Sequence, residues 1–138
     1  MTTARELMTP DPVCVETSST VREAAAKMAS SSVGSLPVCG QDGKLKGMIT
    51  DRDIVVKVLA EGKDPMAVHV GELAQGEVVT IGADDEAEEI LRTMARHEVR
   101  RLPVIDGHEL VGIVAQADVA RALPNETVGA LLADISAE

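Results

Sequence analysis

The sequence predicts an α/β fold in which one β-α-β-β-α unit occurs twice. A motif of the first half returns in the second half: Leu36-Pro37-Val38, Gly47 and Asp53 recur as Leu102-Pro103-Val104, Gly112 and Asp118. The shift is 66 residues from Val21 to Ala87. Repeat arrays have periods of about 20 to 50 residues and need at least three copies. Two copies of this length therefore predict two pseudo-symmetric motifs packed sheet to sheet.

The first half of the first copy predicts a strand and a helix. Val13-Cys14-Val15 reads as the strand, and Thr20 with Glu23 has the spacing of a capping box that begins the helix. The apolar side chains that follow lie at i, i+3, i+4, i+7 and i+8, which is one helical face. They are Val21, Ala24, Ala25, Met28 and Ala29.

A hairpin and a second helix complete the copy. Residues 36–39 and 45–50 flank the turn residues Gln41-Asp42-Gly43, as expected of a β-hairpin. We expect Pro37 to lie where no ladder hydrogen bond is needed. The second helix is predicted to run through Ile54, Val55, Val58 and Leu59 and to end at Gly62.

The second copy repeats this pattern and sets the expected boundaries. Its helix face is Ala87, Ile90, Leu91, Met94 and Ala95. We expect a first motif over 1–62, a connection over 63–76, a second motif over 77–124 and a helical tail over 125–138. Val68 and Val70 suggest a short extended piece in the connection. We expect the tail to pack on its own chain rather than to form a dimer contact, because terminal segments are ordered only when docked.

Composition narrows the possible functions. The 138-residue chain is 45% hydrophobic without a single Phe, Tyr or Trp, and it carries a net charge of -10. This charge argues against nucleic acid or an anionic membrane surface as a partner, since both attract a Lys/Arg excess. No apolar run approaches the ~18 residues of a spanning helix, and Met1-Thr2-Thr3-Ala4-Arg5 opens no signal peptide. We therefore expect a cytoplasmic protein.

The ordered motifs resemble those of tandem CBS domains, also called a CBS pair or Bateman module. The first copy carries Arg5-Glu6-Leu7-Met8-Thr9, Val33-Gly34-Ser35-Leu36-Pro37-Val38 and Gly47-Met48-Ile49-Thr50-Asp51-Arg52-Asp53. The second carries Val99-Arg100-Arg101-Leu102-Pro103-Val104 and Gly112-Ile113-Val114-Ala115-Gln116-Ala117-Asp118. The layout is most similar to small stand-alone CBS-pair proteins of actinobacteria.

The resemblance implies a regulatory module without catalytic activity. Clefts between the copies in this family bind adenosine-containing ligands such as AMP, ADP, ATP or S-adenosylmethionine. The resemblance places Thr50 on the phosphate side of the ligand and Asp53 at the ribose hydroxyls. Arg52 would add a charge-assisted phosphate contact. The alternative is that Thr50 and Asp53 only cap their helix. With no aromatic residue, adenine would lie near Val13, Leu36 and Pro37 in the first copy, or near Val79, Leu102 and Pro103 in the second.

The second copy departs from the family pattern at one position. Ala115 stands where the Thr is expected, while Asp118 is retained. Arg100 and Arg101 could bring compensating positive charge to this region. We favour the other interpretation, in which the two arginines are a solvated surface pair that offsets the acidic run at 84–86.

Cys14 and Cys39 fall in strands that a β-α-β connection would make parallel. They could form a disulfide, which needs Cα atoms about 4.4 to 6.8 Å apart. We favour two reduced, buried cysteines, because cytosolic thiols are normally kept reduced. A bridge would instead indicate a secreted or redox-responsive protein.

No catalytic or metal-ligand pattern is present in the sequence. His69, His97 and His108 are too far apart for a local ligand motif, and we expect them on the surface or in the linker. We therefore predict a non-enzymatic CBS-pair regulator that binds an adenine nucleotide and forms a homodimer. The alternative is a ligand-free module with degenerate clefts that engages a partner protein or responds to redox state.

Overall fold

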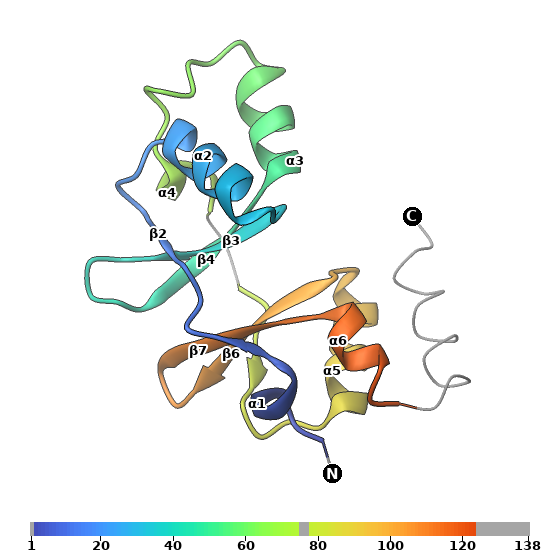
Figure 1. Cartoon of the computed structure of the whole chain (residues 1–138). Helices are drawn as coiled ribbons and strands as arrows, with labels where there is room; N and C mark the ends of the chain where they lie inside the picture. The colour runs from blue at the N-terminus through green and yellow to red at the C-terminus, as the bar shows by residue number, and fades with distance from the viewer. Residues whose placement is uncertain (1, 75–77, 124–138) are drawn as a thin grey trace. The chain divides into compact units, whose positions relative to one another are not determined.

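The computed structural model describes residues 2–74 and 78–123, which form two compact units (Figure 1). One unit spans residues 13–78, and the other combines residues 1–12 with the chain from residue 79 onward. The expected tail over 125–138 lies outside the described residues. No helix of the described residues is long and apolar enough to cross a membrane.

The unit of residues 13–78 is a three-stranded sheet with helices. Its elements are β2 (Val15–Glu16), α2 (Val21–Ser31), β3 (Ser35–Cys39), β4 (Leu45–Thr50), α3 (Asp51–Ile54), the π-helical η1 (Val55–Leu59) and α4 (Val70–Leu73). The strand order is β2-β3-β4, with β2 parallel and β4 antiparallel to β3. The central strand β3 contributes buried Leu36 and Val38 to the core of this unit.

The other unit has a four-stranded sheet. Its elements are α1 (Ala4–Leu7), β1 (Thr9–Pro10), β5 (Ile81–Gly82), α5 (Ala87–His97), β6 (Arg101–Asp106), β7 (Glu109–Ala115) and α6 (Gln116–Ala120). The strand order is β1-β7-β6-β5. Strand β5 runs parallel to β6, while β1 and β6 both run antiparallel to β7.

The predicted β-α-β-β-α repeat is confirmed, and the strand registers match. Val15 pairs with Val38 in one sheet, and Ile81 pairs with Val104 in the other. Helix α2 begins as predicted, because the Glu23 backbone N–H donates to Thr20 Oγ1 at 3.1 Å. Most of the expected helix faces are buried: Val21, Ala24 and Met28 in α2, and Ala87, Ile90, Leu91 and Met94 in α5. Ala25 and Ala95 are partly buried, and Ala29 is exposed.

The predicted second helix of the first copy is confirmed over residues 51–59. It begins as α3 and widens into π-helical η1, and Gly62 follows it with a positive φ of 71°. Ile54 and Val58 are buried, but Val55 and Leu59 are each 54% exposed. The helix therefore buries two of the four apolar residues named for it and exposes the other two.

Two expected extended pieces were also misplaced. The first strand begins at Val15, and Val13 is 52% exposed outside the sheet. Val70 begins helix α4 instead of an extended piece. Its backbone N–H donates to Ser19 O at 2.8 Å, so this turn of helix is held by the loop that leads into α2.

Each compact unit contains the short helix that precedes the other copy in the sequence. Helix α1 precedes the first copy in sequence but bonds to the second, with Ala4 N donating to Asp85 O at 2.9 Å. Helix α4 precedes the second copy but packs in the unit of the first, where its C-terminal neighbour Ala74 lies against Gly47. Met8 lies against Gly112 in the same way. Leu7-Met8 and Leu73-Ala74 therefore occupy equivalent places in exchanged units.

Candidate functional site

Thr50 and Asp53 bond to each other at the junction of β4 and α3. The Asp53 backbone N–H donates to Thr50 Oγ1, and the Thr50 backbone N–H donates to Asp53 Oδ2, both at 3.0 Å. Asp53 Oδ1 also lies 3.4 Å from Lys57 Nζ, and the Asp53 side chain is 24% exposed. The capping interpretation is thus realised in the structure. Capping leaves lone pairs on both carboxylate oxygens, because each oxygen can accept two hydrogen bonds.

Asp51 and Arg52 lie between Thr50 and Asp53 in the chain and add two charges to this polar cluster. Arg52 is exposed and forms no ion pair with the described part of the chain. Asp51 lies beside Gly34: its N–H donates to Gly34 O at 2.9 Å, and a Cβ at Gly34 would come within 3.1 Å of Asp51 Oδ2. Sequence reasoning missed Asp51, although the alignment of Gly34 with Arg100 was a signal that the two copies differ here.

The three residues expected near adenine do not share one environment. Leu36 and Pro37 are buried within β3, and Leu36 belongs to the hydrophobic core of its unit. Val13 is exposed. Of the three, only Val13 therefore offers its side chain to solvent, and the other two offer backbone groups at most.

The second copy lacks the corresponding cap. Ala115 has the extended backbone of an N-cap residue, with φ -104° and ψ 150°, but no side-chain hydrogen bond. Asp118 Oδ1 accepts from Arg121 Nη1 at 3.2 Å. Gln116 Oε1, at the first position of α6, is buried and has no hydrogen-bond partner among the described residues. Asp51 and Gln116 are equivalent positions, so the site differs between copies beyond the Thr-to-Ala change.

Arg100 and Arg101 lie next to this cap position and are exposed. Arg100 O accepts from Gln116 N at 2.8 Å, and Arg101 is paired with Ala115 in the sheet. The acidic run at 84–86 has a different cationic neighbour: Arg5 lies 3.6 Å from Asp84 and 3.1 Å from Asp106. Arg100 and Arg101 are thus solvated, as the favoured interpretation has them, and Arg5 is the cation that lies against the acidic run.

Arg5 is the charged residue that sequence reasoning missed. The pKa of its guanidinium is raised, chiefly by the hydrogen bond and charge of Asp106 and also by Asp84. Asp106 lies 101 positions away in sequence. No local pattern could have indicated this contact.

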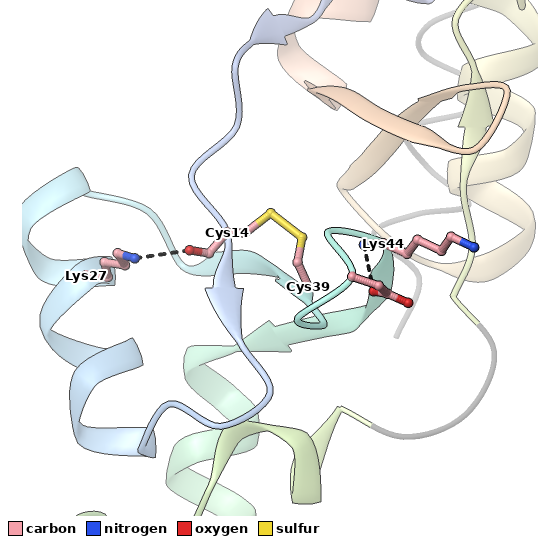
Figure 2. The surroundings of a disulfide bond; sticks show 5 residues. Cys14, Lys27, Cys39 and Lys44 are labelled. Atoms are coloured by element: carbon pink, nitrogen blue, oxygen red, sulfur yellow. Dashed lines mark hydrogen bonds between the residues drawn. A yellow bond between two sulfur atoms is a disulfide. The ribbon is translucent and has the colours of Figure 1, made fainter.

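Cys14 and Cys39 form a disulfide, with their Cα atoms 5.9 Å apart (Figure 2). The favoured interpretation of two reduced cysteines is therefore wrong in this structure. Figure 2 shows Cys14 on the segment that enters β2, with the Lys27 side chain reaching its carbonyl group. Lys27 Nζ donates to Cys14 O at 3.0 Å. Cys39 is the last residue of β3 and only 6% exposed.

The three histidines are exposed, as expected. His69 has one polar neighbour, because its backbone N–H donates to Glu72 Oε2 at 2.7 Å. Within residues 2–74 and 78–123, no three His, Cys, Asp or Glu side chains are grouped as a metal site would require.

The fold, its internal repeat and the Thr50–Asp53 junction are those of a CBS pair. The model of the CBS domain family matches residues 4–60 and 70–125, so the chain belongs to this family. Among curated relatives, hypoxic response protein 1 of Mycobacterium tuberculosis is 47% identical over 128 residues, which cover 93% of this chain and 90% of that protein. The resemblance to stand-alone actinobacterial CBS-pair proteins is confirmed.

Solved structures agree with this assignment. The crystal structure of Hypoxic Response Protein I with two coordinated zinc ions has a TM-score of 0.82 and 48% identity, and covers 89% of this chain and 100% of that one. CBSX2 in complex with AMP has a TM-score of 0.76 and 26% identity, and the match covers 88% of this chain and 96% of CBSX2. The CBS domain pair of MJ0100, in complex with 5'-methylthioadenosine and S-adenosyl-L-methionine, has a TM-score of 0.78 and 27% identity. The match covers 88% of this chain and 95% of that one.

Proposed function

We propose that this protein is a non-enzymatic regulator that binds an adenosine-containing ligand through its first CBS motif. Thr50, Arg52 and Asp53 are the residues we assign to the ligand. AMP, ADP, ATP and S-adenosylmethionine are the candidates, because AMP and S-adenosylmethionine are held by the CBS-pair neighbours CBSX2 and MJ0100.

The partly exposed Asp53 carboxylate is the observation that carries this proposal. It is already oriented by one hydrogen bond from the Thr50 backbone N–H and one ion pair to Lys57. A carboxylate held in one orientation can accept hydrogen bonds from both hydroxyls of a ribose without further loss of side-chain entropy. Arg52 stands beside it as an exposed cation suited to a phosphate.

Thermal unfolding by calorimetry tests the proposal, with and without AMP, ATP or S-adenosylmethionine. A ligand present at 100 times its dissociation constant should raise the free energy of unfolding by about 2.7 kcal/mol. Asp53→Ala should abolish this increase. Asp118→Ala is the matched control, because it removes the equivalent carboxylate of the second copy and should leave the increase in place.

The competing function is a ligand-free module that engages a partner protein or responds to redox state. Ala115 favours it, because the second copy lacks the cap hydroxyl. Absence of any shift with all three ligands would contradict the nucleotide proposal and support this one.

We also propose a homodimer, with the exposed apolar residues Val55, Val56 and Leu59 of η1 as the surface that would be covered. Sedimentation equilibrium of Val56→Lys beside the wild type would test it, because a buried Lys would dissociate a dimer.

The disulfide bears on the compartment in which the protein resides. It supports the secreted alternative, since disulfides persist in oxidising environments. Rapid alkylation of thiols in cell and medium fractions would determine where the oxidised protein resides.

A further inference from the structure

The disulfide reinforces one of the shortest strand pairings in the molecule. Strand β2 consists of Val15 and Glu16, and it pairs with β3 only through Val38 and Cys39. Cys14 is the residue immediately before this strand, so the bridge to Cys39 extends the attachment of the chain by one residue. Val13 lies immediately before Cys14 in the chain. It is exposed, so few packing contacts hold it in place.

The second copy builds the same pairing without a bridge. Ile81 and Gly82 pair with Val104 and Ile105 in the register that Val15 and Glu16 use with Val38 and Cys39. Thr80 stands at the position of Cys14, and Ile105 at that of Cys39. The internal repeat therefore shows that this strand pairing does not need the covalent bond.

A second attachment of the same segment is also confined to the first copy. Lys27 reaches from α2 to the Cys14 carbonyl oxygen. Its counterpart in α5 is Thr93, whose hydroxyl donates instead to Glu89 O of its own helix at 3.0 Å. The first copy thus fixes the backbone at residue 14 in two ways that the second copy does not use.

We propose that the Cys14–Cys39 disulfide is a reducible lock on the first nucleotide site. This inference rests on the function proposed above. In the oxidised protein the bridge fixes Cys14 and, with it, the neighbouring Val13, which the family resemblance places on the adenine side of the ligand. Reduction frees this segment up to β2, and the ligand must then order it on binding. Affinity for the ligand consequently falls when the bridge opens.

The chemistry is thiol–disulfide exchange with a dithiol reductant. A thiolate of the dithiol attacks the sulfur of Cys14, which is the more exposed of the two residues, and Cys39 leaves as a thiolate. The second thiol of the reductant then attacks the mixed disulfide and releases Cys14. The dithiol becomes a cyclic disulfide, and the protein gains two electrons and two protons as two thiols.

Isothermal titration with AMP and, separately, S-adenosylmethionine tests the lock. It compares the oxidised protein, the protein reduced with dithiothreitol, and Cys14→Thr/Cys39→Ile, which carries the residues of the second copy. Cys14→Ser/Cys39→Ala is a second bridge-free variant in case Ile overpacks the Cys39 position. Because the chain has only two cysteines, counting two free thiols by mass after alkylation verifies complete reduction. Hydrogen exchange of each form reports how far the release extends.

We expect binding about tenfold weaker in the reduced protein, as for the loss of one pre-ordered backbone residue. Both bridge-free variants should match it with and without dithiothreitol. Hydrogen exchange should rise most at residues near 13–16, above the uniform rise that a lower free energy of unfolding causes elsewhere. Equal or tighter binding after reduction would overturn the lock and leave the nucleotide function standing. A rise in exchange that is uniform over the protein, with no excess near residues 13–16, would also overturn it, because the bridge would then be a structural staple. Absence of binding in every form, the oxidised one included, would overturn the nucleotide function and the lock together.

Discussion

Lys27 Nζ donates a 3.0 Å hydrogen bond to the carbonyl oxygen of Cys14, thirteen positions earlier in the chain. The bond joins helix α2 to the segment that enters β2, on the same residue that the disulfide ties to β3. Two independent contacts thus converge on a residue outside the regular secondary structure.

Removal of the bridge should lower stability without abolishing the fold. Cys14→Thr/Cys39→Ile opens a loop closed over 25 positions, and the chain-entropy relation gives a loss of about 3 kcal/mol. Urea unfolding of the oxidised wild type, the reduced wild type and the variant would measure it. The reduced wild type and the variant should have the same free energy of unfolding. A variant much less stable than the reduced wild type would indicate strain from Ile at position 39.

Ala115→Thr should stabilise the second copy. Its N-cap backbone, at φ -104° and ψ 150°, is close to that of Thr50, at φ -116° and ψ 160°. A hydroxyl there can accept from the Asp118 backbone N–H, and such caps contribute about 1 kcal/mol. Calorimetry should show a higher unfolding temperature for Ala115→Thr and a lower one for the matched change Thr50→Ala. Equal unfolding temperatures for Ala115→Thr and the wild type would show that the two junctions differ in more than the hydroxyl.

Gly112→Ala should destabilise the unit that contains α1. A Cβ at this position would collide with the Met8 side chain and lie 2.9 Å from Thr9 O, which is backbone and cannot turn away. Overpacking of this kind costs about 1 to 3 kcal/mol. Gly34→Ala is the control, because its Cβ would meet only the Asp51 carboxylate, which can rotate. Urea denaturation of both variants would distinguish the two cases, and a larger loss for Gly34→Ala would contradict the assignment.

Asp42 should contribute a small acid-sensitive part of the stability. Its pKa is lowered by the hydrogen bond from the Lys44 backbone N–H first, and then by Lys46. A lowered pKa in the folded state means that the contribution is present above the unfolded pKa and is lost as the pH falls through the folded value. Asp42→Asn should therefore unfold with a shallower decline in melting temperature between about pH 5 and pH 2. An unchanged decline would show that this exposed carboxylate contributes nothing measurable.

The sequence predicted the parts of the fold that short-range patterns determine. Thr20 and Glu23 marked the start of α2, and the turn before Leu45 marked the first hairpin, because capping and turn chemistry act within a few residues. The strand expected at Val13 began two residues later, since an apolar run cannot reveal where a partner strand ends. Helix α4 was missed because its hydrogen bonds go to Thr17 and Ser19, far from it in sequence.

The candidate site was predictable only in part. Thr50 and Asp53 followed from the family motif, and the structure brings them together at 3.0 Å. The disulfide could not be predicted, because it depends on the distance between the Cα atoms of Cys14 and Cys39, which the sequence does not give. The contact of Arg5 with Asp106 depends on the pairing of β1 with β7, which joins distant parts of the chain.

The placement of α1 sets an order of events during synthesis. Ala4 and Arg5 leave the ribosome first, yet their backbone partners Asp85 and Ala83 are made some eighty residues later. Domains generally fold as units while the chain is being made, so residues 13–78 can assemble as soon as they emerge. The segment before them must wait for the second copy. A nascent chain that stops after the first copy therefore carries an unpaired leading segment, which can pair only once residues 83–85 have been made.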